Sequence, residues 1–276
     1  MIHKHKHDAP KAGNFVITLG YNHQNETDKK QSYKHQKKNN MTKRLLLISN
    51  STNYGEEYLE YTKPHIKEFL GTAVKEVLFI PYAGVSISYD EYTAKVAAVF
   101  LKLGYNLKSV HHCDDPVAAV EEAEAIAVGG GNTFHLVHMM HETGVMDAIR
   151  KKAGTGTPYM GWSAGSNVAC PSLKTTNDMP IIQPKSFETL GLVDFQINPH
   201  YSDAIIPNHN GETREDRIRE FLIANPEMIV VGLKEGTMLR IEGEDIEYIG
   251  SKTIKVFRKD QPTLEFDKNA SIDFLK

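Results

Sequence analysis

The sequence predicts an α/β fold in which a doubly wound, mostly parallel sheet is flanked by helices. From residue 41 onward, short continuous apolar runs alternate with segments of helical period, which is typical of parallel sheets with strands buried on both faces. Glycine-rich turns follow two of these runs, at 129–131 and 161–165. Because ligands bind at the carboxyl ends of the strands in open α/β sheets, we expect both turns at that edge.

The first part of this body alternates strands and helices without interruption. Gly71 and Gly104 follow two helical segments as stop signals, while Asp115 and Pro116 supply an N-cap and a first-turn proline for a third. The expected strands are 45–49, 74–81, 106–111, 125–128 and 158–160, and the expected helices are 56–70, 90–103, 116–123 and 133–152.

The alternation changes after residue 176. A turn is expected at 176–180, strands at 195–198 and 227–233, a helix at 211–224, and short antiparallel edge strands within 237–257. We find no internal repeat and no interior linker, and therefore expect a single domain over residues 41–276.

Residues 1–40 differ in composition from the rest of the chain. They hold eight Lys against three Asp or Glu, whereas the remainder holds 24 Lys or Arg against 32 Asp or Glu. We expect 1–40 to be a disordered extension, either a tag or a segment upstream of a natural start at Met41. Its alternating His3, His5 and His7 could bind metal, although a tag or a solvated tail is the favoured interpretation.

Composition also restricts the classes of partner and compartment. The acidic body gives no support for a nucleic-acid surface. The longest early apolar run, 15–19, is too short for a membrane span or a signal peptide, so no membrane partner is expected. With only two cysteines in 276 residues, the chain fits a reducing, cytoplasmic compartment.

The segment Gly161-Trp162-Ser163-Ala164-Gly165 reads G-x-S-x-G directly after an apolar run. A serine on a sharp strand-to-helix turn is held in a strained backbone conformation that exposes its Oγ, and side chains at the flanking glycines would collide with the strand and helix. Ser163 is therefore the candidate nucleophile. The alternative is a glycine-rich turn that happens to contain a serine.

A serine nucleophile needs a base, and the base is usually oriented by a carboxylate. His200 follows Asn198-Pro199 at a predicted strand end, which places it at the same edge as Ser163. Glu235, just past another strand, and Asp178, in the loop after Ser163, are both candidates for the acid. We prefer Glu235, because a carboxylate just past a strand can be held rigidly beside His200.

The turn Gly129-Gly130-Gly131-Asn132 allows two interpretations. It could hold a phosphate, although it lacks the lysine and spacing of a P-loop. Alternatively, the backbone N–H groups of Gly131 and Ala164 could stabilise an oxyanion.

Four further segments carry a resemblance to a known family. They are 161–167 (GWSAGSN), 175–180 (TTNDMP), 197–200 (INPH) and 211–217 (GETREDR), and Gly129–Thr133 fits as well. Together they closely resemble the peptidase E family of α-aspartyl dipeptidases, in order, from about residue 41 to the C-terminus.

The resemblance implies a serine peptidase with a class I glutamine-amidotransferase-like fold that hydrolyses dipeptides with an unblocked N-terminal aspartate. It implies Ser163 as nucleophile, His200 as base, and either Asp178 or Glu235 as the third residue. It also implies that Arg214 binds the aspartate side chain, which is chemically sensible for a guanidinium. We place Asn132 among the substrate-binding residues, and expect no metal or organic cofactor in the reaction.

Two other functions stay open at this point. One is a cyanophycinase-like enzyme of the same fold that cleaves β-aspartyl-arginine units. The other is a protein without catalytic activity that holds a nucleotide or other anion in the 129–132 turn. The expected partner in the favoured case is a small Asp-X dipeptide, and the protein itself is expected to be a monomer or homodimer.

Overall fold

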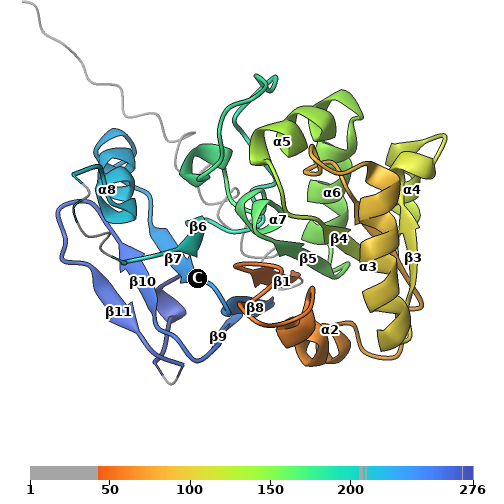
Figure 1. Ribbon diagram of the computed structural model, residues 1–276, viewed down its shortest axis with the longest axis horizontal. Helices are drawn as coiled ribbons and strands as arrows, with labels where there is room; N and C mark the ends of the chain where they lie inside the picture. Colours follow the sequence, from red (N-terminus) through yellow and green to blue (C-terminus); the bar gives the residue numbers. More distant parts are fainter. Residues whose placement is uncertain (1–42, 205–207, 209, 269, 276) are drawn as a thin grey trace, which may run out of the picture. The chain divides into compact units, whose positions relative to one another are not determined.

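The computed structural model describes residues 43–204, 208, 210–268 and 270–275 (Figure 1). These residues lie within one compact unit, Lys38–Lys276. The extension predicted for 1–40 lies outside the described residues. Within the described part of the chain, no helix combines the length and apolar character needed to cross a membrane.

A seven-stranded sheet in the order β3-β2-β4-β5-β1-β8-β9 forms the centre of this unit (Figure 1). The first five strands in this order pair in parallel, and β8 and β9 add an antiparallel edge. The bounds are β1 Arg44–Ile48, β2 Glu76–Ile80, β3 Asn106–Ser109, β4 Ile126–Val128, β5 Tyr159–Trp162, β8 Met238–Glu242 and β9 Asp245–Ile249. The predicted fold class is therefore confirmed, including the antiparallel edge.

Helices cover both faces of this sheet. Alternate residues of β1 enter different cores, since Leu45 and Leu47 belong to one buried cluster and Leu46 and Ile48 to the other. Helices α2 and α3 contribute to the second cluster, and α4, α5 and α6 to the first. Their bounds are α2 Lys63–Leu70, α3 Tyr89–Leu103, α4 Pro116–Glu122, α5 Thr133–Glu142 and α6 Val145–Gly154.

In three predicted elements, a break or another element takes part of the predicted range. The helix expected at 56–70 begins only at Lys63, after a 3₁₀ turn, η1 Glu60–Thr62. The long helix expected at 133–152 is interrupted at Gly144, whose φ of 74° ends one helix and opens the next. The strand expected at 106–111 ends at Ser109, and η2 Val110–His112 follows it.

A second, four-stranded sheet in the order β11-β10-β7-β6 follows Ser163 in the sequence, and the sequence pattern did not predict it as a separate sheet. Strands β6 and β7 are parallel, and α8 packs on them through a small core that includes Ile218, Leu222 and Val230. The bounds are β6 Gln196–Tyr201, β7 Val230–Lys234, β10 Ile254–Phe257, β11 Leu264–Phe266 and α8 Arg214–Ala224, with short helices α7 Ala164–Asn167, η3 Leu173–Thr175 and η4 Asp273–Leu275.

Candidate active site

Ser163 lies on the sharp turn between β5 and α7, near the middle of the large sheet. Its φ of 54° and ψ of −111° are in a region that residues other than glycine rarely adopt. A Cβ on Gly161 would lie 2.2 Å from the Gly165 carbonyl oxygen, and one on Gly165 would lie 2.1 Å from that of Val128. The glycines of G-x-S-x-G are thus required by close backbone approach, as the sequence predicted.

His200 reaches this serine from the second sheet. The register of β6 shifts between Pro199 and Tyr201, and His200 itself has a φ of 53°. This bulge re-aims the side chain, so that His200 Nε2 lies 2.9 Å from Ser163 Oγ. The predicted meeting of the alcohol and the imidazole is therefore present in the structure.

Glu235 completes a hydrogen-bonded series. It follows β7 directly, and its Oε1 lies 2.7 Å from His200 Nδ1. The Gly236 N–H donates to Asn50 Oδ1 at 2.8 Å, which fixes the turn that presents the carboxylate. The side chains of His200 and Glu235 are 39% and 50% exposed, so water screens this pair in part.

Asp178 has other partners. Its Oδ2 accepts hydrogen bonds from the Thr133 N–H at 2.7 Å, from Thr133 Oγ1 at 2.6 Å and from Thr176 Oγ1 at 3.0 Å. Both ring nitrogens of His200 are already engaged, by Ser163 and Glu235. The structure thus brings Ser163, His200 and Glu235 together, and it places Asp178 as a support of the start of α5.

The glycine-rich turn lies against the nucleophile. A Cβ on Gly130 would come within 3.0 Å of Ser163 Cβ, and one on Gly131, at a φ of 138°, would lie 2.2 Å from the Ala83 carbonyl oxygen. Tyr92 Oη donates to the Gly130 carbonyl at 2.9 Å, which holds the turn in place. Ala164 is the first residue of α7, so its backbone N–H has no partner within the helix. Both predicted oxyanion donors therefore belong to segments that adjoin Ser163.

Arg214 is linked to the site by hydrogen bonds through the side chain of Asn177. It donates to Asn177 Oδ1, and Asn177 Nδ2 donates to the Pro199 carbonyl at 2.7 Å, next to His200. Burial, with a smaller effect from nearby Arg217, lowers the pKa of Arg214 from its usual value, while Asp178 acts in the opposite direction. A half-buried guanidinium of this kind forms its strongest hydrogen bonds with a carboxylate, which can accept two of them in parallel.

Two hydrogen bonds hold the side chain of Asn132. Its Oδ1 accepts from the His135 N–H at 3.0 Å and so caps α5, and its Nδ2 donates to the Met179 carbonyl at 2.9 Å. Asn132 still lines a pocket of about 570 Å³ that also contains Ser163, His200 and Gly131. The side-chain amide is thus held by α5 and by Met179, beside the pocket.

Two polar residues that position the site were missed in the sequence. Ser49 and Asn50 follow β1 and are 0% and 1% exposed. Ser49 Oγ accepts from the His200 N–H at 3.0 Å and donates to the Leu233 carbonyl at 2.7 Å. The available signal was a pair of small polar residues directly after the apolar run 45–48.

The fold and the site together define a class of protein. An α/β sheet presents a serine on a strained turn, followed by a histidine and a carboxylate in one hydrogen-bonded series, which is the arrangement of serine hydrolases on several unrelated folds. The model of peptidase family S51 matches residues 45–249. This chain belongs to peptidase family S51.

Named relatives agree with this assignment. The chain is 56% identical over 235 residues to peptidase E of Nostoc sp., covering 85% of this chain and 97% of that one. It is 46% identical over 214 residues to peptidase E of Escherichia coli, covering 78% and 93%. The prediction of a serine peptidase of the dipeptidase class is therefore confirmed.

Solved structures agree at the level of the fold. A peptidase from an acI-B1 actinobacterium has a TM-score of 0.61 at 20% identity, covering 85% of this chain and 98% of that one. A structure titled as a putative peptidase E protein from Listeria monocytogenes has a TM-score of 0.56 at 21% identity, covering 75% and 98%. Both support the glutamine-amidotransferase-like fold that the sequence resemblance implied.

Proposed function

We propose that this chain hydrolyses dipeptides with an unblocked N-terminal aspartate through an acyl-enzyme on Ser163. The observation that carries the proposal is the series Ser163 Oγ–His200 Nε2 at 2.9 Å and His200 Nδ1–Glu235 Oε1 at 2.7 Å. Such a series activates a serine that is otherwise a weak nucleophile.

In the first half-reaction, Ser163 Oγ attacks the carbonyl carbon of the Asp-X bond. Its proton passes to His200 Nε2, and Glu235 stabilises the imidazolium through Nδ1. The oxyanion is stabilised by the N–H groups of Gly131 and Ala164. His200 then gives the proton to the leaving nitrogen as the C–N bond breaks, which releases residue X and leaves an aspartyl ester on Ser163.

In the second half-reaction, water attacks the ester carbon. His200 Nε2 takes one proton from the water and returns it to Ser163 Oγ as the ester bond breaks, so that free aspartate leaves and the enzyme is regenerated. Neither half-reaction involves a group from outside the chain other than water and substrate.

The selectivity for aspartate is assigned to Arg214. The guanidinium is half-buried and held by Asn177, whose other end is bonded beside His200. A glutamate substrate is one methylene longer and would misplace the scissile carbonyl by more than about 1 Å, which costs on the order of a hundredfold in rate. The requirement for a free amino group rests on the family resemblance.

The test is hydrolysis of Asp-Leu, N-acetyl-Asp-Leu, Glu-Leu, Leu-Leu and β-Asp-Arg, measured by release of the free C-terminal residue, leucine or arginine. Wild-type protein is expected to cleave only Asp-Leu efficiently. Arg214→Ala should lower kcat/KM for Asp-Leu by about 10- to 100-fold, the range for loss of a charged hydrogen bond. Arg217→Ala is the matched control, because Arg217 lies on the same helix but pairs with Glu212 at 3.6 Å and is 60% exposed.

Two results would contradict this specificity. Cleavage of β-Asp-Arg without cleavage of Asp-Leu would indicate the cyanophycinase-like alternative. An Arg214→Ala enzyme that still prefers Asp-Leu over Leu-Leu would remove Arg214 from substrate recognition, whatever its overall rate.

A further inference from the structure

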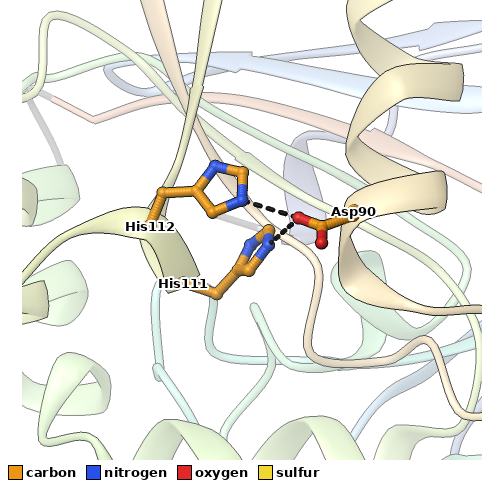
Figure 2. Close-up of side chains that lie close together, drawn as sticks. All are labelled: Asp90, His111 and His112. Carbon is orange, nitrogen blue, oxygen red and sulfur yellow. Dashed lines mark hydrogen bonds and ion pairs between the residues drawn. The ribbon is translucent and has the colours of Figure 1, made fainter.

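Three side chains outside the peptidase site point their ligand atoms toward one another (Figure 2). Asp90 lies in the first turn of α3, and His111 and His112 form part of η2, just after β3. Asp90 Oδ1 lies 3.0 Å from His111 Nε2 and 2.6 Å from His112 Nε2. Two imidazoles that are adjacent in sequence therefore share a single carboxylate oxygen.

We propose that Asp90, His111 and His112 bind a divalent transition-metal ion of the zinc type. Two imidazoles and one carboxylate match the ligand preferences of Zn²⁺ and its neighbours, whereas Mg²⁺ and Ca²⁺ prefer oxygen alone. The three ligand atoms lie within 4.8 Å of one another. Ligand atoms around tetrahedral zinc lie about 3.3 Å apart, so the Asp90 oxygen has to move slightly away from both imidazole nitrogens to admit the ion.

The side chains of Asp90 and His112 are free enough of neighbours to rotate and allow this movement. The side chains of Asp90 and His112 are 77% and 58% exposed, whereas that of His111 is only 15% exposed. The His111 ring is further held edge-on by Tyr89, at 5.5 Å between ring centres. One ligand is therefore fixed in place and two can adjust to it.

Contacts behind the ligands fit the same role. Ser109 Oγ lies 2.7 Å from His111 Nδ1, and Thr93 Oγ1 lies 3.0 Å from Ser109 Oγ. A metal-bound histidine usually donates its other ring N–H to an oxygen, which fixes the tautomer and the ring orientation.

This ion stays outside the peptidase reaction. Its three ligands are absent from the residues that line the pocket at Ser163, but the pocket lining includes Ser86, Ile87 and Tyr92, which flank Asp90 along the chain. An ion bound here joins the start of α3 to η2. It therefore stabilises the wall of the pocket without contacting the reacting atoms.

The experiment measures zinc binding by calorimetry and by thermal shift. The full chain carries His3→Ala, His5→Ala and His7→Ala throughout, because those histidines could bind zinc themselves. This background protein is expected to bind one zinc ion and to rise in Tm with zinc, while Mg²⁺ has no effect. Adding His112→Ala should weaken binding more than tenfold and abolish the zinc-dependent shift in Tm.

Two further variants sharpen the result. Ser109→Ala keeps all three ligands and should weaken zinc binding by about 10-fold or more, as expected for loss of a contact that orients a ligand. His141→Ala is the matched control, since His141 is a helix histidine bonded to the Glu188 carbonyl and lies outside the cluster. The proposal is overturned if the background protein shows no zinc-dependent shift, or if His112→Ala and His141→Ala respond to zinc equally.

Discussion

Replacing Glu235 by Gln tests which carboxylate orients His200 in the proposed mechanism. The substitution keeps the size of the side chain and removes its charge. At the observed 2.7 Å between Nδ1 and Oε1, the attraction between a carboxylate and an imidazolium is about 1.5 kcal/mol at the dielectric constant of water and about 6 kcal/mol at an effective value of 20. Because Glu235 is 50% exposed, we expect a value near the middle, about 3 kcal/mol.

This free energy converts into a rate. In the proposed mechanism, the imidazolium forms only as Ser163 gives up its proton, so the lost attraction should raise the barrier and leave substrate binding largely unchanged. A loss of about 3 kcal/mol lowers kcat by about a hundredfold. The assay is the steady-state release of aspartate from Asp-Leu at saturating substrate, with circular dichroism to check that the variant is folded.

Asp178→Asn is the matched comparison. Asp178 accepts from Thr133 and Thr176 rather than from His200, and an asparagine oxygen can keep part of these bonds. We expect kcat to fall by less than about tenfold, because a structural hydrogen bond contributes about 1 kcal/mol. If Asp178→Asn loses more kcat than Glu235→Gln, the assignment of Glu235 as the orienting acid is wrong.

Three further predictions concern the nucleophile, the turn and a surface ion pair. Ser163→Ala should reduce kcat by several orders of magnitude with Tm unchanged, and substantial residual turnover would remove Ser163 as nucleophile. Gly165→Ala should destabilise the fold by about 3 kcal/mol or more in urea unfolding, because of its 2.1 Å approach to Val128; Gly154→Ala, with open space around it, should not. Lys234, at 2.9 Å, lowers the pKa of Asp203, so Asp203→Asn should lower Tm at pH 7.

The sign of the Asp203 effect with pH follows from the direction of the shift. A carboxylate whose pKa is depressed by folding stabilises the protein above its unfolded-state pKa, and this contribution disappears as pH falls through the folded-state value. The difference in Tm between wild type and Asp203→Asn should therefore shrink as pH falls below about 4. A difference that grows toward acid would contradict the role of Lys234.

Local patterns were enough to predict most strands and helices of the large sheet. The run 45–48 is apolar at every position because each residue faces one of two cores. In a strand with one exposed face, polar residues would alternate with apolar ones. The interruption at Gly144 was missed because glycine is tolerated inside helices, and only its positive φ separates α5 from α6. The separate four-stranded sheet was missed because the apolar pattern shows where strands lie but does not show which strands pair with one another.

The sequence predicted the part of the site that is formed by one short segment, the turn at Ser163. The geometry at Ser163 follows from two glycines beside it, so sequence spacing was informative. Choosing between Glu235 and Asp178 was beyond sequence reasoning, since each is an acid in a turn, and the difference lies in which donors surround it. The cluster at Asp90 was missed because His111 was taken as the end of the strand 106–111, and the sequence does not show that Asp90, in the preceding helix, lies beside it.

The proposed catalytic series depends on the contact between the two sheets. Ser163 belongs to the large sheet through β5, whereas His200 and Glu235 belong to the small sheet through β6 and β7. Ser49, at the end of β1, bonds both the His200 N–H and the Leu233 carbonyl from a fully buried position. Leaving a buried hydroxyl without such partners destabilises the fold by about 1–3 kcal/mol. Separating the two sheets at Ser49 is therefore unfavourable. Ser49, which has no role in the proposed proton transfer, thus helps to hold His200 beside Ser163.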